Sequence, residues 1–343
     1  MEDSPLITKT ISCPHCKNII SVQGSPGETI EITCPTCQTA GIFSFPRDDT
    51  SEKTKELSAA VVVRNLSYRY PKTNKNAIKD ISFSINKGEI FGFLGPNGAG
   101  KTTTQKIIIG LFKDYVGDIN LLGKNLQNWS TNMYNKIGVG FELPNHYQKL
   151  TALENLELFS SFYKEQTIPP MDLLKMVELE KDANQRVGSF SKGMKSKLNF
   201  ARSLINDPEV LFLDEPTTGL DPVNSRLIKN IIKKKRSEGK AIFLTTHNMN
   251  DADELCDRVG FIVDGKLMLV ESPRNLKLKH GKKIVRIEYL KDEQLIRREF
   301  NLKNLGNNKE FLDILNTGTI QTIHSAEATL DDIFIKATGR KII

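Results

Sequence analysis

The stretch EIFGFLGPNGAGKTTT, residues 89–104, decides the fold. An apolar run, 90–94, leads into a loop that fits the pattern G-x-x-x-x-G-K-[ST] in full, and helical patterning follows. A loop between a buried strand and a helix directs free backbone N–H groups and the helix dipole toward a phosphate. Its glycines let the backbone approach the oxygens without an intervening Cβ. The predicted phosphate-binding residues are Gly95, Pro96, Asn97, Gly98, Ala99, Gly100, Lys101, Thr102 and Thr103.

A second stretch, VLFLDEPTTGLDP at 210–222, predicts a strand that is buried on both faces and stops at Pro216. Asp214 and Glu215 at its end would repel each other and resist ionising unless a cation lies between them and a phosphate. We expect Lys101 to bridge the β- and γ-phosphates, and Thr102 and Asp214 to hold Mg²⁺. Glu215 would face the attacking water. A chance glycine turn beside an acidic pair is the alternative, which the order strand, loop, helix, strand disfavours.

The composition indicates two or three domains and an ordinary globular chain, with 343 residues, 38% hydrophobic and 26% charged. Apolar runs reach only a handful of residues, whereas a membrane span needs about 20. The first ten residues, MEDSPLITKT, are acidic and polar, unlike a secretory signal. We therefore expect a chain without membrane spans in a cytoplasmic, reducing setting.

Four of the five cysteines form CPHC and CPTC, which are Cys13, Cys16, Cys34 and Cys37. Two C-x₂-C pairs with 17 residues between them have the spacing of a tetrahedral zinc site, so residues 1–46 resemble a zinc ribbon. About 45 residues bury too little core to fold without such a metal. A thioredoxin-type redox pair and disulfides are the alternatives, and the second matching pair disfavours both. We expect Cys256 to be a packed core thiol.

The net charge of +7 is uneven, because residues 1–46 carry two basic against four acidic residues. A nucleic-acid surface would be basic, so we favour a structural or protein-docking role for the ribbon and do not expect nucleic acid as a partner. Residues 47–59 are charged and non-periodic, which indicates a linker. A basic run at 233–236 favours a solvated helix face, with anionic lipid or nucleic acid as the alternative.

Residues 60–280 resemble the ATP-binding subunit of an ABC transporter, with every major motif in order. SFSKGM at 189–194 takes the signature position with Ser191 and Gly193 kept, although Lys192 and Met194 depart from the commonest LSGGQ form. The resemblance implies that Asp221 belongs to the D-loop, His247 is the switch histidine that holds the γ-phosphate, and Tyr70 stacks on adenine, with Tyr68 as its competitor. Other histidines, including His146, are expected to have no such role.

Glu142 in GVGFELPN stands where the family usually has glutamine. A carboxylate there can still face Mg²⁺ or its water, but it cannot donate an amide hydrogen bond. Exporter branches of the family tolerate this glutamate. Residues 281–343 resemble the small extension of these exporter-type ATPases, and we expect a hairpin, a helix, a strand and a closing helix in that order.

The resemblance implies a P-loop α/β cassette with a helical subdomain, between a zinc ribbon and an α/β extension. It implies an ATPase that uses ATP and Mg²⁺, pairs with a second copy or a similar subunit, and energises export through a separate membrane permease. The chain would then lie on the inner face of the membrane. Two alternatives stand beside this one. A soluble ABC protein could act on ribosomes or nucleic acid through its ribbon, and an ABC switch could bind ATP without hydrolysing it, although Glu215 and His247 disfavour the latter.

Overall fold

The computed structural model describes residues 7–25, 28–44, 59–280, 284–326 and 328–339. The chain divides into two compact units, 1–58 and 59–343, which are treated separately below. Most of the predicted linker lies outside the described residues. Its last position, Ala59, is the first residue of a strand of the second unit.

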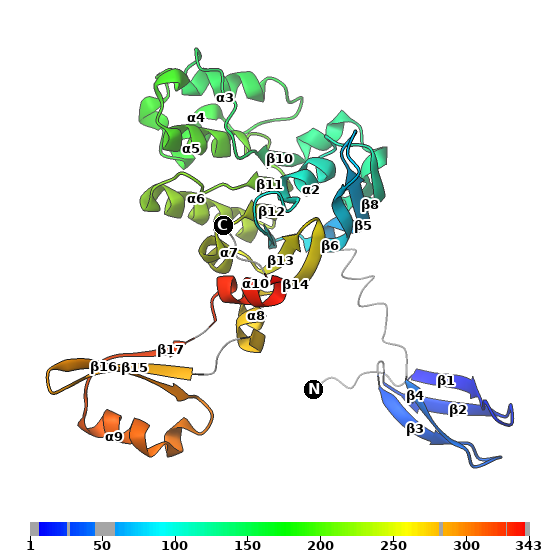
Figure 1. Ribbon diagram of the computed structural model, residues 1–343. Coiled ribbons are helices and arrows are strands. Elements are labelled where there is room, and N and C mark those ends of the chain that lie inside the picture. Colours follow the sequence, from blue (N-terminus) through cyan, green and yellow to red (C-terminus); the bar gives the residue numbers. More distant parts are fainter. Residues whose placement is uncertain (1–6, 26–27, 45–58, 281–283, 327, 340–343) are drawn as a thin grey trace. The chain divides into compact units, whose positions relative to one another are not determined.

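The first unit consists of two antiparallel hairpins (Figure 1). Strand β1 (Ile7–Ser12) pairs with β2 (Ile19–Gly24), and β3 (Thr29–Thr33) pairs with β4 (Ala40–Ser44). One C-P-x-C sequence forms each turn. The carbonyl of its first cysteine accepts a hydrogen bond at 2.9 Å from the N–H of Lys17 or Gln38, and both of these residues have positive φ. The same knuckle is therefore built twice.

The centre of the second unit is a six-stranded sheet in the order β10-β11-β12-β7-β13-β14. Its first five strands are parallel and β14 is antiparallel at the edge. Both motif strands are central, so their apolar runs are buried on both faces, as the sequence predicts. The strands are β7 (Ile90–Leu94), β10 (Ile137–Gly140), β11 (Val210–Asp214), β12 (Ala241–Thr246), β13 (Arg258–Val263) and β14 (Lys266–Glu271).

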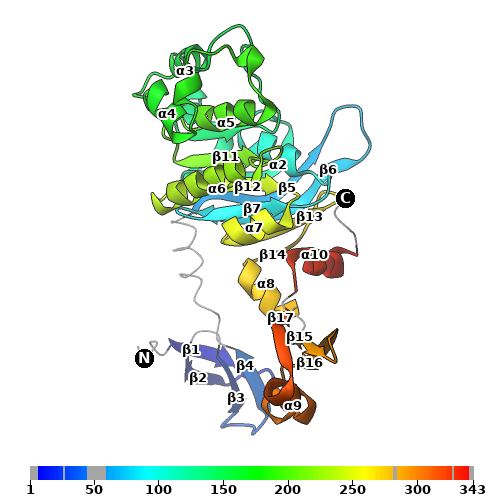
Figure 2. The ribbon, with the colours of Figure 1, turned by 90° about the vertical axis from the view of Figure 1, so that its left-hand side faces the viewer.

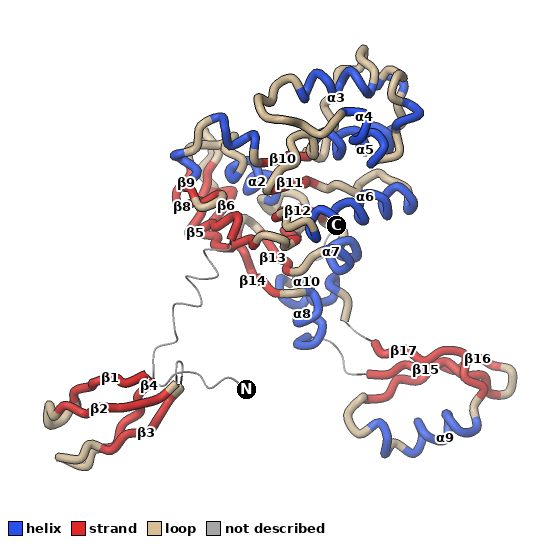
Figure 3. Tube along the Cα trace, turned by 180° about the vertical axis from the view of Figure 1, so that it is seen from behind, coloured by secondary structure: helices blue, strands red, loops and turns tan. Residues whose placement is uncertain are grey.

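Alternate residues of these strands enter two separate cores, as the period of two requires. Ile90 and Leu94 of β7 join a core that is formed with helices, whereas Phe91 and Phe93 join a core with a second, antiparallel sheet. That sheet, seen together in Figure 3, has the order β6-β5-β8-β9. It comprises β5 (Ala59–Arg69), β6 (Asn76–Asn86), β8 (Tyr115–Leu121) and β9 (Lys124–Asn125), and α2 (Lys101–Ile108) packs in the same core.

Residues 125–205 contain three α-helices, which gather at one end of the cassette (Figure 2), together with the short strand β10. These three helices are α3 (Ala152–Ser160), α4 (Pro170–Met176) and α5 (Lys192–Arg202). Three more helices follow in the chain, which are α6 (Pro222–Ser237), α7 (Met249–Leu255) and α8 (Pro273–His280). The second unit thus has mixed α/β content with a helical subdomain, as predicted.

The C-terminal extension has the predicted elements in the predicted order. A hairpin of β15 (Ile284–Lys291) and β16 (Gln294–Asn301) precedes α9 (Lys309–Thr317), β17 (Thr319–Ala326) and α10 (Leu330–Thr338). The sheet order is β16-β15-β17. The closing helix α10 does not share the extension's small core. Its Leu330, Ile333 and Phe334 lie in the cassette core, where the rings of Phe334 and Phe261 meet edge to face at 5.1 Å.

Among the helices that the structure describes, none has the length and apolar character needed to cross a bilayer. The longest of them is α6, with 16 residues, and its last turn carries Lys234, Lys235 and Arg236.

Candidate functional site

The predicted phosphate-binding loop joins β7 to α2, which begins at Lys101. Gly100 caps the helix with φ 113°, and a Cβ there would lie 2.6 Å from Ile78 Cδ1, so only glycine fits. A Cβ on Gly95 would lie 2.2 Å from the carbonyl oxygen of Ile262. The loop is thus packed tightly against β6 and β13, while Asn97 and Gly98 in its middle are exposed.

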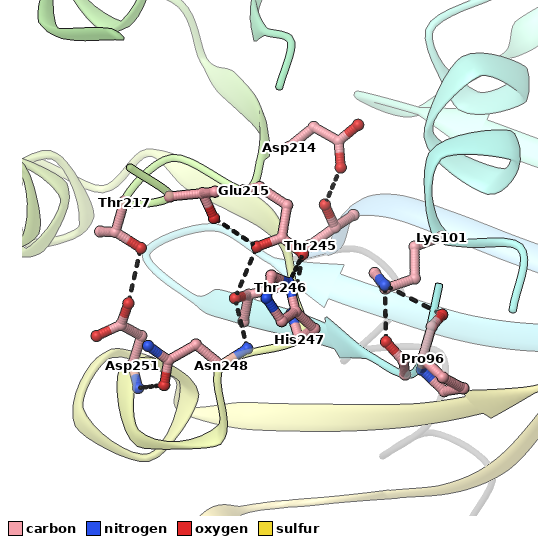
Figure 4. Close-up of polar contacts among 12 residues, drawn as sticks. Pro96, Lys101, Asp214, Glu215, Thr217, Thr245, Thr246, His247, Asn248 and Asp251 are labelled. Atoms are coloured by element: carbon pink, nitrogen blue, oxygen red, sulfur yellow. Dashed lines mark hydrogen bonds and ion pairs between the residues drawn. The ribbon is translucent and has the colours of Figure 1, made fainter. Parts of the chain in front are cut away.

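Lys101 is buried inside the loop, where its Nζ donates to the carbonyls of Gly95 at 2.7 Å and Pro96 at 3.3 Å (Figure 4). Burial lowers the pKa of its ammonium below the ordinary value, and the carboxylates of Glu215, Asp214 and Glu142 oppose that shift. These three predicted acidic residues therefore all lie near enough to Lys101 to stabilise its charged form.

Thr102 and Asp214 are brought together by the adjacent ends of the loop and β11. Thr102 Oγ1 donates to Asp214 Oδ2 at 2.9 Å, and the hydroxyl of Thr245 on β12 donates to the other oxygen of this carboxylate. Hydroxyl and carboxylate oxygens are the ligands that Mg²⁺ prefers. The donor set and its placement beside the loop fit a magnesium ion.

Glu215 and His247 also meet directly. His247 Nδ1 lies 2.7 Å from Glu215 Oε1, and the backbone N–H of His247 donates to the same oxygen at 2.9 Å. The hydroxyls of Thr246 and Thr218 each donate to Oε2 at 3.1 Å. Glu215 has φ +50°, a conformation that only strong surrounding contacts maintain in a residue with a Cβ. The two neighbouring carboxylates are thus each held by their own donors.

The threonines that hold these carboxylates were not among the predicted site residues. Thr245 and Thr246 precede His247 in FLTTHN, and Thr218 follows Glu215 in the D-loop sequence. The sequence signal that could have identified Thr245 and Thr246 as site residues is the presence of two polar residues at the end of an otherwise apolar strand. The register that pairs Asp214 with Thr245 makes the contact, and the sequence does not display that register.

Tyr70 and Tyr68 differ in accessibility. Tyr70 is 38% exposed and its hydroxyl lies 2.9 Å from Thr103 Oγ1 beside the phosphate-binding loop. Tyr68 is buried and stacks on Phe112 with ring centroids 5.3 Å apart. Of the two, only Tyr70 has a ring that a base can reach next to the loop.

Ser191, Gly193 and Asp221 belong to two other helix starts. Ser191 caps α5 by accepting from Met194 N–H at 3.2 Å, and Asp221 caps α6 by accepting from Val223 and Asn224 N–H at 3.0 Å. These hydrogen bonds, led by the one from Asn224, lower the pKa of Asp221. Figure 1 shows α5 and α6 apart from α2. Within one chain these residues do not join the cluster around Lys101.

Glu142 is exposed and follows β10. The residues beside it line a cavity of about 820 Å³ between β10, α3 and α5. His146, for which the sequence predicts no role, lies in the wall of this cavity with Nε2 3.0 Å from the carbonyl oxygen of Lys195, and burial lowers its pKa to about 4. Arg202 lies over the ring of Phe159 at 4.6 Å in the same wall.

The four cysteines at the two knuckles form one cluster, with all their sulfurs within 4.8 Å of one another. Cys13 and Cys37 have sulfurs 3.6 Å apart, as do Cys16 and Cys34. Sulfurs bound to one zinc at 2.3 Å in a tetrahedron are about 3.8 Å apart. Hydrogen bonds with Thr39 lower the pKa of Cys37 to about 6, which favours the thiolate that binds metal. The cluster fits zinc.

The two remaining sequence features have ordinary structural roles. Cys256 is buried against Gly92, and burial raises its pKa. In the basic run, Lys233 pairs with Glu254, Lys235 with Glu238 and Arg236 with Asp257. Three of the four charges of the run are thus paired within the chain, which favours the solvated helix face over an anionic partner.

Comparisons with known proteins agree with this geometry. The family model described as ABC transporter matches residues 78–218, and the one described as fluoroquinolone efflux ABC transporter C-terminal domain matches residues 283–327. A fluoroquinolones export ATP-binding protein of Mycobacterium tuberculosis is 52% identical over 281 residues, which cover 82% of this chain and 93% of the relative. A Nod factor export ATP-binding protein I of Burkholderia orbicola is 33% identical, and the match covers 83% of this chain and 98% of the relative.

Two solved structures resemble the cassette. The ATP-binding subunit of an ABC transporter has a TM-score of 0.58 and 29% identity, and the match covers 64% of this chain and 92% of that one. A dimeric ATP-binding cassette in a post-hydrolysis state, bound to ADP and Pi, has a TM-score of 0.57 and 29% identity, with 62% and 98% covered.

Proposed function

Since the chain belongs to the ABC transporter ATP-binding subunits and is an ATPase of that family, we propose that it drives export through a separate membrane permease. The observation that carries this proposal is the cluster at the ends of β7, β11 and β12. There Lys101 in its loop, the Thr102–Asp214 pair and the Glu215–His247 pair lie together. Relatives named as export ATP-binding proteins support the direction of transport.

In this proposal Lys101 and the N–H groups of the loop bind the β- and γ-phosphates. Thr102 and Asp214, with Glu142 nearby, would hold Mg²⁺, which supplies positive charge against the phosphates when it is bound. Glu215 orients the attacking water and accepts its proton, and His247 holds the γ-phosphate and senses its loss. Tyr70 stacks on adenine beside the loop.

Two chains complete each ATP site, with Ser191, Gly193 and Asp221 of one facing the loop of the other. Ser191 and Asp221 each begin a helix, and a free helix start attracts phosphate. A dimeric relative bound to ADP and Pi supports this arrangement. The partner is a second copy of this chain or a similar subunit.

The permease would contact the cassette at the cavity beside Glu142. Phe141 and Asn145 line this cavity together with His146, so a partner segment seated there would be next to the site that changes on hydrolysis. The proposed location is therefore the inner face of the membrane. Fluoroquinolone-type drugs are the proposed cargo, because the C-terminal family model and a relative over half identical both carry that name.

The cysteine cluster is proposed to hold one structural zinc ion. Its four sulfurs would complete the tetrahedron, which agrees with a site that stabilises a fold. The two hairpins bury few side chains apart from Cys13, Val22 and Cys34, so the metal would replace a hydrophobic core.

Glu215→Gln tests the ATPase assignment. The amide still fills the site but cannot accept a proton, so we expect ATP binding to be kept and turnover to fall by roughly 10²–10⁴-fold. Steady-state ATP hydrolysis and nucleotide affinity are measured side by side on the whole chain. Turnover near that of the wild type would refute the role of Glu215.

Copurification tests the partner. The tagged chain, extracted with mild detergent from membranes, is expected to bring with it a protein with several membrane spans. Ribosomes or nucleic acid in its place would support the soluble alternative and overturn the transporter assignment.

A further inference from the structure

The segment 215–221 carries both Glu215 and Asp221, and its first residue is held directly by β12 and His247. Glu215 has φ +50°, which local preference disfavours in a residue with a Cβ, whereas Gly219 adopts its φ of +77° freely. Thr218 N–H donates to the carbonyl of Glu215 at 3.1 Å, which closes the turn on itself. A contact between the residues after Glu215 and another element would fix the orientation of the segment further.

Thr217 provides that contact. Its hydroxyl donates to Asp251 Oδ2 at 2.7 Å, across 34 residues of sequence. Asp251 lies in the first turn of α7, directly after the segment that carries His247. The hydrogen bond therefore ties the loop that follows the water-facing carboxylate to the helix that follows the switch histidine.

The contact closes a circuit of hydrogen bonds, drawn in Figure 4. Asp251 N–H donates to Asn248 Oδ1 at 3.2 Å, and Asn248 N–H donates to Thr246 Oγ1 at 3.0 Å. Thr246 Oγ1 in turn donates to Glu215 Oε2 at 3.1 Å. The carboxylate of Glu215 is thus reached from Asp251 by two routes, one through each loop.

Asp251 is itself fixed from the other side. Its Oδ1 accepts from Lys229 Nζ of α6 at 3.1 Å, and the two side chains are only 11% and 14% exposed. Burial lowers the pKa of Lys229, but hydrogen bonds to Glu254 and Asp251 outweigh burial and raise it, so this lysine stays charged. A carboxylate that accepts one hydrogen bond on each oxygen, one of them from a charged lysine, in a nearly buried position is a rigid anchor.

We propose that Asp251 is a positioning residue for ATP hydrolysis, which sets the orientation of Glu215 through Thr217 and does not touch the substrate. The proposal rests on the proposed function of Glu215. It goes beyond the phosphate-binding motifs, because Asp251 and Thr217 belong to neither the phosphate loop nor the acidic strand end.

The chain contains matched controls. Glu254 also pairs with Lys229, yet it is 44% exposed, and its ion-pair partners are Lys229 and Lys233 rather than residues of the catalytic loops. Glu254→Ala therefore removes a carboxylate from the same lysine without touching Thr217. Thr217→Ser keeps the hydroxyl that Thr217→Val removes, while the shape changes little in either case.

The test measures kcat and KM for ATP on the whole chain, with thermal melting to confirm folding. Thr217→Val and Asp251→Ala are each expected to lower kcat by about 10- to 100-fold with KM unchanged, because a displaced reacting group costs rate and not ground-state binding. Thr217→Ser and Glu254→Ala should keep the wild-type kcat.

The double variant separates a shared contact from two unrelated losses. The double variant Thr217→Val with Asp251→Ala should hydrolyse ATP no more slowly than the slower single variant, because both substitutions remove the same hydrogen bond. Wild-type kcat in folded Thr217→Val, or losses that multiply in the double variant, would overturn the proposal. If Asp251→Ala does not fold, the comparison of Thr217→Val with Thr217→Ser still tests whether the hydroxyl at position 217 is needed for turnover.

Glu215→Gln in the same series keeps this result apart from the proposed function. If it is inactive while Thr217→Val hydrolyses ATP normally, Asp251 has no positioning role and the ATPase assignment stands. If Glu215→Gln is as active as the wild type, the proposed role of Glu215 is wrong, whatever the Thr217 variants show.

Discussion

At the scale of single residues, the neighbouring carboxylates show what a sequence can and cannot reveal. The sequence predicts that Asp214 and Glu215 require a cation, and the structure supplies hydroxyl donors to both and places the imidazole of His247 beside Glu215. The identity of the residues was predictable from the motif. Their partners were not, because these depend on the register between β11 and β12. The same holds for Thr217 and Asp251, which no motif connects.

The cysteines permit a prediction at this scale. Purified chain should contain one zinc, and Cys13→Ser should lose it, because a tetrahedral site with three thiolates binds zinc far more weakly. Elemental analysis by mass spectrometry gives the metal content per chain.

Cys256→Ser is the control, since this buried thiol lies in the cassette core. It should keep the full zinc content. Unchanged zinc in Cys13→Ser would contradict the assignment of the ligands.

At the scale of elements, the two motif strands and the helix after the phosphate-binding loop followed from their residue patterns, whereas the docking of α10 did not. The sequence TLDDIFIKATGR predicted a helix, and Thr329 caps it in a reciprocal pair with Asp332. Nothing in that pattern tells whether its apolar face covers the extension or the cassette. The structure shows the cassette, because Phe334 meets Phe261 there.

Phe334→Ala should therefore destabilise the cassette itself. Phe334 is fully buried, and removing such a ring lowers the free energy of unfolding by about 3–5 kcal/mol. Chemical denaturation followed by the ATP-binding signal measures this on the cassette. Ile335→Ala, at a neighbouring position that is 38% exposed, should cost less than about 1 kcal/mol. Equal effects of the two would argue against this docking.

At the scale of the whole molecule, the ATP site is predicted to need two chains, and one chain alone leaves its helix starts at Ser191 and Asp221 apart from Lys101. The sequence indicated this division only through resemblance, because composition and periodicity describe a single chain. The placement of the cysteine unit relative to the cassette is likewise not encoded in any motif.

Mixed dimers test the shared site. One tagged chain carries Lys101→Ala and the other Ser191→Arg, both with Glu215→Gln so that bound ATP is retained. If two chains share each site, one site takes both lesions and the other none, so the mixed dimer should occlude one ATP. Each single-variant dimer should occlude none. A mixed dimer that occludes no ATP would show that each chain builds its own site.

The return of α10 to the cassette also orders events during synthesis. The ribosome makes β15, β16, α9 and β17 before α10. The extension can therefore fold while the apolar surface around Phe261, which α10 later covers, is still exposed. For that interval the nascent cassette exposes a surface that attracts chaperones and invites aggregation. Slow translation of residues 284–326 would lengthen the exposure, so codon choice in this segment should affect how much active protein a cell obtains.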